Sequence, residues 1–257
     1  MALSFDVDHE TPWLRDGDVL PGGLSEGEYG SRRALPRLLS LLESVGCPAT
    51  FFFPAVSGLL HPNDVSAVVA GGHEVGVHGW IHERPDLLPA GVEAELLERS
   101  LDALEGLAGQ RPRGQRTPSF ATSAQTLALA EKAGLVYDSS LMADDEPYEV
   151  LLDSRPSGLV EIPVDWSRDD AAYFVMARFG GSRPSPSASD VLTVWQEEFR
   201  CARDEGGLFQ LTLHPDLIGH RGRIWIIREL MAEIASGGDA WLATHLDAAH
   251  HCLESAP

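Results

Sequence analysis

Short runs of β-forming residues alternate with longer helical patterns from one end of the chain to the other. Strands are expected at residues 2–5, 49–53, 74–77, 114–116, 135–138, 160–163, 209–213 and 240–243. Between them, apolar residues recur at helical spacing in segments 35–45, 97–107, 123–133, 191–202 and 224–234. Because helices follow strands throughout, the pattern predicts a parallel α/β sheet in a single domain over residues 1–257. About seven or eight such units favour an irregular (β/α)7-type barrel, with an open doubly wound sheet as the alternative.

The composition is that of an ordinary globular protein with a strong excess of acid. The 257 residues include 19 Lys and Arg against 39 Asp and Glu, a net charge of −20, and 44% are hydrophobic. Repulsion between like charges therefore argues against nucleic acid and anionic membranes as partners. The sequence shows no export signal and no apolar run of about 20 residues, so we expect a cytoplasmic protein. A first strand that begins almost at Met1 leaves room for an upstream segment.

Titratable side chains follow five of the predicted strands. In chain order they are Asp6 and Asp8, His78 and His82, Arg116, Asp138, and His214. The carboxyl ends of the strands of a parallel α/β barrel meet at one face, and active sites are built there. The convergence of these residues therefore predicts an enzyme.

His78 and His82 are four residues apart, so a helical turn would place both on one face and near a shared metal ion. Such a pair also arises by chance, but Asp8 completes a three-ligand set that leaves a position open for water or substrate. Asp6 and Asp8 flank Val7, so an extended backbone would point both to the same side. Because one site resists two ionised carboxylates, we expect one to bind the metal and the other to act as base. The same ligand set occurs in non-haem Fe(II) oxygenases, which are an alternative class.

In order along the chain, these residues resemble the five motifs of the polysaccharide deacetylases, the family-four carbohydrate esterases. The matching segments are SFDVD at 4–8, His78 and His82 after GHEVG at 72–76, RTPSF at 116–120, YDSS at 137–140 and LHP at 213–215. The resemblance extends over about residues 3–245. Segments 27–30 and 138–148 are similar to a subgroup with peptidoglycan deacetylase-like proteins and cyclic-imide hydrolases. Three positions depart from the family pattern, because Val7 separates two usually adjacent aspartates, Gly79 replaces Ser or Thr, and Phe120 replaces Tyr.

The resemblance implies a role for each of these residues. A divalent metal ion, expected to be Zn²⁺, would be held by Asp8, His78 and His82. Asp6 would be the catalytic base, although the two aspartates could exchange roles, and Arg116 would orient it. Asp138 would hold that arginine, and His214 would protonate the departing nitrogen. The candidate substrate-binding residues are Pro118 and Phe120 in the third motif and Trp80 and Trp166 near the motif loops.

The implied reaction is hydrolysis of a non-peptide C–N bond. It would release acetate from an N-acetyl sugar or open a small cyclic amide. The missing export signal favours the alternative of a cytosolic cyclic-imide or ureide (allantoin-like) hydrolase, and a catalytically silent barrel is a further alternative. A homo-oligomer is an expectation at the level of the family. Elsewhere, we expect Asp169, Asp170 and His245 at the solvated surface, and His61 has no predicted partner.

Overall fold

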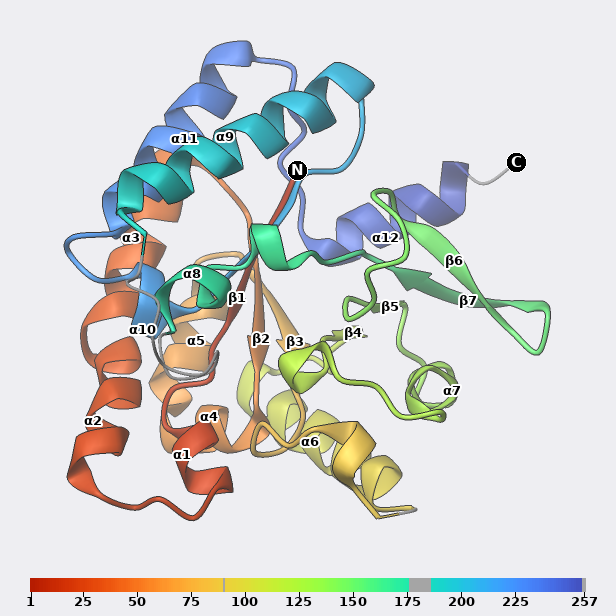
Figure 1. The fold of residues 1–257 in the computed structure, drawn as a ribbon. Coiled ribbons are helices and arrows are strands. Elements are labelled where there is room, and N and C mark those ends of the chain that lie inside the picture. The colour runs from red at the N-terminus through yellow and green to blue at the C-terminus, as the bar shows by residue number, and fades with distance from the viewer. Residues whose placement is uncertain (90, 176–185, 256–257) are drawn as a thin grey trace.

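Eight strands in the described part of the chain form one curled sheet (Figure 1). The structure is a computed structural model that describes residues 1–89, 91–175 and 186–255. The Gly-, Pro- and Ser-rich composition of residues 180–189 predicts a surface loop, and most of this stretch lies outside the described residues. The strands are β1 (Ala2–Asp6), β2 (Thr50–Phe53), β3 (Glu74–Val77), β4 (Gly114–Gln115), β5 (Tyr137–Asp138), β6 (Tyr148–Leu152), β7 (Arg155–Glu161) and β8 (Gln210–Leu213). Their order is β6-β7-β5-β4-β3-β2-β1-β8, and every neighbouring pair is parallel except β6 and β7.

Helices connect the strands and surround the sheet (Figure 1). The α-helices are α1 (Thr11–Arg15), α2 (Pro21–Tyr29), α3 (Leu35–Val45), α4 (Ala55–Leu60), α5 (Pro62–Ala70), α6 (Val92–Ala108), α7 (Thr126–Lys132), α8 (Ala171–Phe174), α9 (Ala188–Glu205), α10 (Pro215–Ile218), α11 (Ile224–Gly237) and α12 (His245–Ser255). A π-helical turn, η1 (Gly30–Ala34), joins α2 to α3. Short 3-10 turns are η2 (Pro85–Leu87), η3 (Pro118–Phe120) and η4 (Trp166–Arg168). Each predicted helical pattern lies within or overlaps one of these helices. None of the helices in the described residues is long and apolar enough to cross a membrane.

The segment that follows β7 brings the two ends of the curled sheet together. Asp169 forms an isolated parallel bridge with Thr212 in β8, and the Asp170 N–H donates to the Thr212 carbonyl at 3.2 Å. Strand β8 pairs in turn with β1. The parallel strands therefore curl into an irregular barrel with their carboxyl ends at one face, which confirms the predicted (β/α)7-type fold.

Two strand predictions differ from the structure. Residues 240–243 form no strand, and only Ala243 pairs with Ala2 in an isolated bridge. The hairpin strand β6 was not predicted. Its two-residue turn, Asp153 and Ser154, has φ of 49° and 62°, a geometry that an Asn-Gly pair usually signals. The missing glycine removed the sequence signal for this hairpin.

Large aromatic rings fill the barrel where glycines make room for them. A Cβ at Gly114 would lie 2.0 Å from the Tyr137 ring, and one at Gly76 would lie 2.5 Å from the Phe52 ring. Both rings are fully buried. Helix α12 packs on β1, β5, β6 and β7. Its first residue, His245, is fully buried and lies edge-on to Phe52.

Candidate active site

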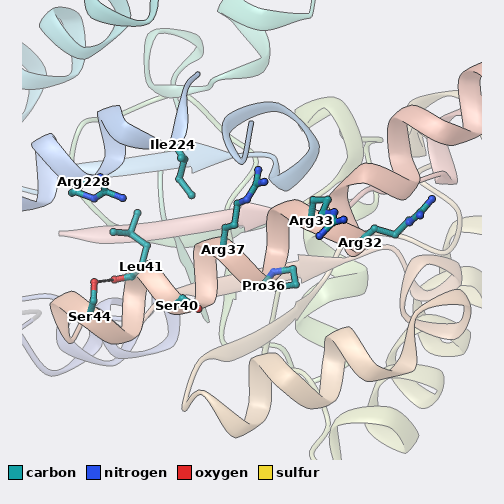
Figure 2. Close-up of a pocket in the computed structure, with 9 residues that line it drawn as sticks. All are labelled: Arg32, Arg33, Pro36, Arg37, Ser40, Leu41, Ser44, Ile224 and Arg228. Carbon is teal, nitrogen blue, oxygen red and sulfur yellow. Dashed lines mark hydrogen bonds between the residues drawn. The ribbon is translucent and has the colours of Figure 1, made fainter. Parts of the chain in front are cut away.

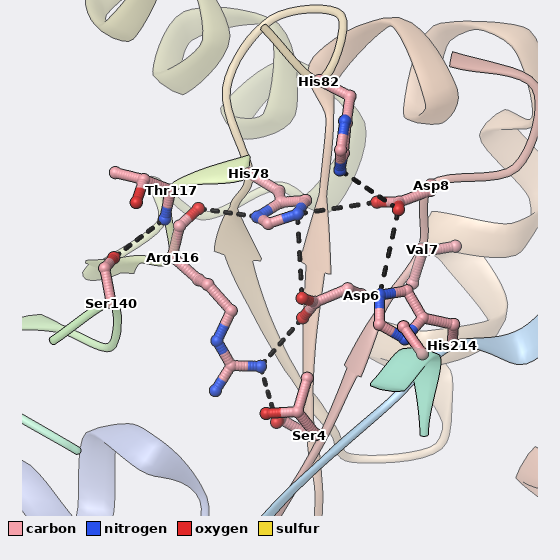
Figure 3. Close-up of polar contacts among 12 residues, drawn as sticks. Ser4, Asp6, Val7, Asp8, His78, His82, Arg116, Thr117, Ser140 and His214 are labelled. Atoms are coloured by element: carbon pink, nitrogen blue, oxygen red, sulfur yellow. Dashed lines mark hydrogen bonds and ion pairs between the residues drawn. The ribbon is translucent and has the colours of Figure 1, made fainter. Parts of the chain in front are cut away.

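Three of the predicted side chains converge at the carboxyl end of the barrel (Figure 3). His82 Nε2 lies 3.2 Å from Asp8 Oδ2, and His78 Nε2 lies 3.5 Å from Asp8 Oδ1. The candidate ligand atoms of all three residues lie within 4.8 Å of one another, and all three side chains are buried. One carboxylate and two imidazoles at this spacing form a donor set that suits a single divalent cation.

A tight loop, and not the predicted helical turn, brings the two histidines together. Residues 79–82 form a turn and a bend after β3. His82 adopts a left-handed φ of 62°, which is uncommon for a residue other than glycine and typical of functional sites. Gly79 has a φ of 73°, where Ser or Thr would be strained. The departure from the family motif at Gly79 therefore follows from the backbone of this loop.

The surroundings of His78 and Asp8 are consistent with a bound cation. The Nδ1–H of His78 donates to the Arg116 carbonyl at 2.7 Å, which leaves the Nε2 lone pair facing the carboxylates. Burial lowers the pKa of His78 to about 4, so the ring is neutral, as a metal ligand must be. Burial alone would raise the pKa of Asp8, but the attraction and hydrogen bond of His82 outweigh it and hold that pKa well below the usual value. Asp8 Oδ1 is buried without a hydrogen-bond partner among the described residues. A free lone pair beside an unsatisfied carboxylate oxygen fits a positive ion.

Arg116 is fully buried and anchors Asp6. Its Nη1 donates to Asp6 Oδ1 at 2.8 Å and to Ser4 Oγ at 2.7 Å. Its Nε and Nη2 donate to the carbonyl and the hydroxyl of Ser139, at 3.1 and 2.9 Å. Nη2 also lies 3.2 Å from His245 Nε2, which must accept because a guanidinium only donates. All three nitrogens are engaged, so the guanidinium is a rigid support for Asp6.

The structure places Asp138 differently from the implied role. Its Oδ2 accepts from Gln115 Nε2 at 2.7 Å, and the partners of Arg116 in the described residues do not include it. Successive residues of an extended chain point to opposite sides, so Ser139 faces Arg116 and Asp138 faces Glu161. Burial raises the pKa of both carboxyls, and repulsion by Asp138 raises that of Glu161 further. A proton shared by the two acids would relieve this repulsion, and we expect one behind the site.

Replacing Glu161 by Gln tests this pair through its effect on stability. Glu161 Oε1 accepts from the N–H groups of Ser140 and Leu141 at 2.9 and 2.8 Å, and the Gln oxygen can keep both bonds. The pKa of Glu161 is higher in the folded protein than in the unfolded chain, where it is near 4.5. Folding therefore takes up a proton at pH values above the unfolded pKa, and the free energy of unfolding falls as the pH rises. The slope is about 1.4 kcal/mol per pH unit for one proton. The free energy of unfolding is measured with denaturant at pH 6 and at pH 8. It should fall less between these two pH values in Glu161→Gln than in the parent protein, and an equal fall in both would contradict the shared proton.

His214 follows β8 and pairs with Asp170, which lies in the segment that follows β7 and contacts β8. Its Nδ1 lies 2.7 Å from Asp170 Oδ1 and 3.7 Å from Asp169 Oδ1, and its Nε2 lies 4.0 Å from Asp8 Oδ2. Burial alone would lower the pKa of His214, but the attraction of Asp170 and Asp169 outweighs it and raises the pKa well above the usual value. This pair of acids therefore favours the protonated form of His214.

Three residues expected at the surface are buried around the site. Asp169 and Asp170 are 2% and 0% exposed, and His245 is 0% exposed. Asp169 and Asp170 come after β7, and the other site residues also come after strands. This position after a strand is a sequence signal that could have predicted their place in the site. His245 has no comparable signal, because it begins a helix more than one hundred residues from Arg116.

A second layer of ion pairs supports the loop after β1. His9 Nε2 lies 3.1 Å from Asp64 Oδ2, and His61 Nε2 lies 2.8 Å from Glu10 Oε2. His61 therefore has a partner that sequence reasoning did not find. Arg15 reaches from α1 to His82, with Nη1 3.0 Å from both the ring Nδ1 and the carbonyl oxygen. These contacts orient the segment that carries Asp8.

The four candidate substrate-binding residues do not share one surface. Phe120 and Trp166 form an edge-to-face pair with ring centroids 4.9 Å apart, and Trp166 is 41% exposed. The Phe120 ring centre lies 5.9 Å from the Arg116 guanidinium. Trp80 instead lies under the guanidinium of Arg99 from α6, at 3.9 Å, and packs against the core. Pro118 is buried beside Gly79. The structure therefore leaves Phe120 and Trp166 as the aromatic pair near the site.

The fold is a parallel barrel, and carboxylates and histidines lie together at the ends of its strands. These features are typical of hydrolases built on such a barrel. Residues 27–137 match the family described as Polysaccharide deacetylase. A peptidoglycan deacetylase of Helicobacter pylori is 30% identical over 260 residues, which cover 91% of this chain and 88% of that protein.

Solved structures agree with this match. A Mycobacterium smegmatis protein assigned to the polysaccharide deacetylases has a TM-score of 0.90 and 34% identity over 98% of this chain and 89% of its own. An allantoinase shares the fold with a TM-score of 0.87 and 23% identity, covering 100% of this chain and 90% of its own. The chain belongs to the polysaccharide deacetylase family, whose members are hydrolases of C–N amide bonds.

Proposed function

We propose that the chain is a metal-dependent hydrolase that releases acetate from an N-acetylated sugar. The observation that carries the proposal is the convergence of a three-ligand set with an anchored carboxylate and an acid-paired histidine in one buried site. Asp8, His78 and His82 would hold the ion, and Zn²⁺ suits two imidazoles and a carboxylate. When bound, such an ion supplies Lewis-acid polarisation of the amide carbonyl and activation of water.

Asp6 has the geometry of a general base. Its Oδ1 is held by Arg116 at 2.8 Å, while its Oδ2 lies 3.7 Å from His78 Nε2 and points toward the ligand set. The anchored oxygen fixes the carboxylate, so the second oxygen is free to accept a proton from the attacking water. This geometry supports Asp6 as the base and Asp8 as the ligand.

His214 has the properties of a general acid. Asp170 holds its Nδ1, so Nε2 faces the ligand set, and the raised pKa favours the imidazolium, in which Nε2 carries a proton. That proton can pass to the departing nitrogen as the C–N bond breaks. Acid–base assistance of this kind contributes about 10²–10⁴-fold. An oxygenase would leave Asp6, Arg116 and His214 without a role.

Two observations support an N-acetylated sugar as the substrate. A relative that covers most of this chain is a peptidoglycan deacetylase. The half-exposed Trp166 and its partner Phe120 offer flat apolar faces close to Arg116, which suit the apolar face of a sugar ring.

A small cyclic imide or ureide is the second candidate. Asp6, Asp8 and His214 are only 2%, 3% and 6% exposed, and such deep burial of the reacting groups favours a compact substrate. The allantoinase with the same fold provides a precedent for a barrel of this shape acting on a ureide.

A substrate panel with and without a chelator tests both the reaction and its substrate. Purified protein loaded with Zn²⁺ is assayed for acetate release from N-acetylglucosamine oligomers and for ring opening of succinimide and allantoin. We expect acetate release that a chelator abolishes and added Zn²⁺ restores. Ring opening alone would replace the substrate proposal. Turnover that survives complete metal removal, or no turnover of either substrate class, would contradict the proposed function.

A further inference from the structure

A groove between residues 32–44, in η1 and α3, and helix α11 is positively charged, although the molecule as a whole is acidic. Acidic residues outnumber basic ones by 39 to 19 in the whole chain. The groove has a volume of about 550 Å³ and is lined by Arg32, Arg33, Pro36, Arg37, Ser40, Leu41, Ser44, Ile224 and Arg228. Four of these side chains are arginines and none is acidic. Figure 2 shows three arginines projecting from the segment 32–37 and Arg228 from α11.

Most of this positive charge is not neutralised by the protein. Arg33, Arg37 and Arg228 form no ion pair with a carboxylate in the described part of the chain, whereas Arg84, Arg111, Arg155, Arg200 and Arg203 are each paired. Arg32 has one exposed partner, Glu28, at 3.7 Å. Arg37 Nη1 donates to Tyr29 Oη at 2.8 Å and to the Gly219 carbonyl at 3.2 Å. These two bonds hold Arg37 at the groove while its charge stays uncompensated.

Neighbouring groups respond to this local field. His220 stacks on Tyr29 with ring centroids 4.0 Å apart, next to the bonds of Arg37. Burial lowers the pKa of His220, and the positive charges of Arg223 and Arg37 lower it further. The four arginines and the lack of an acidic residue in its lining make the groove electropositive, although the molecule carries a net charge of −20.

We propose that this groove binds a small polyanion with two or more phosphate or carboxylate groups. Guanidinium groups present planar forks that match both anions, and several arginines around one groove can each contact a different group of the ligand. A volume of about 550 Å³ lies within the range of small-molecule sites. The site is separate from the proposed catalytic residues, because none of the groove residues belongs to them.

The test compares a double charge reversal in the groove with a matched reversal elsewhere. Calorimetric titration uses fructose 1,6-bisphosphate as the phosphate probe and tricarballylate as the carboxylate probe, at low and at 0.3 M salt. The groove variant is Arg33→Glu/Arg228→Glu. The control is Arg113→Glu/Lys132→Glu, which changes the net charge equally at two exposed residues outside the groove. Thermal unfolding checks the fold, and Arg33→Gln/Arg228→Gln replaces the groove variant if charge reversal prevents folding.

We expect the parent protein to bind at least one probe, more weakly at high salt, and the groove variant to bind it at least tenfold more weakly. The control should bind within about twofold of the parent. The probe that binds identifies the anion class. No binding to the parent, or equal losses in groove variant and control, would overturn the proposal. In another outcome, the parent protein binds neither probe and self-associates, while the groove variant stays monomeric in sedimentation. That result would overturn the proposal and show that the groove binds the acidic surface of another copy of the chain.

Discussion

His82→Ala is expected to lose bound metal and hydrolytic activity together. The substitution removes one of three ligands, and the remaining Asp8 and His78 cannot complete the donor set. Lewis-acid stabilisation contributes several kcal/mol, and each 1.36 kcal/mol is a factor of ten, so we expect a loss of about a thousandfold or more in kcat/KM. Plasma emission of the purified protein gives the metal content beside the kinetics.

Two controls make this result specific. His250→Ala removes an exposed histidine from α12 and should leave metal content and turnover unchanged. Thermal unfolding of His82→Ala shows whether the loop still folds, because His82 has a left-handed φ that alanine adopts poorly. A metal-free His82→Ala protein with full activity would refute the proposed metal site.

His214→Ala is expected to keep its metal and lose turnover. Among the contacts of the described residues, His214 reaches the ligand set through Asp8 at 4.0 Å, so its removal leaves the three ligands in place. Without a proton donor for the departing nitrogen, kcat for an acetamide should fall by about 10²–10⁴-fold. Metal content and kcat are measured on the same preparation.

The leaving group distinguishes a lost acid from a damaged site. The acetate ester of 4-nitrophenol departs as a stable phenolate and needs little protonation, so His214→Ala should retain most of any esterase activity. Asp170→Asn keeps the histidine but removes the charge that raises its pKa, and should show a smaller loss with amides than His214→Ala. Equal loss of ester and amide turnover in His214→Ala would contradict the acid role.

The sequence was sufficient for the features that depend on local chain geometry. Seven of the predicted strands overlap observed strands, because β-forming runs bounded by helical patterns fix the local conformation. The polar residues that follow those strands meet at one face, since parallel strands in a barrel share their carboxyl ends. Asp6, Asp8, His78, His82, Arg116 and His214 lie close together for this reason, and their roles stay proposals.

Contacts between distant segments depended on the tertiary structure. His245 contacts Arg116, 129 residues away in sequence, because α12 packs on strands of the sheet. Asp170 contacts His214, 44 residues away, because the segment after β7 pairs with β8. Asp138 turns toward Glu161 for the same kind of reason, since the pleat at the end of β5 points Ser139 to Arg116. Residue types and spacing specify which side chains a strand carries to its end. The curl of the sheet and the path of the closing segments determine which of those side chains touch, and these follow from packing over the whole chain.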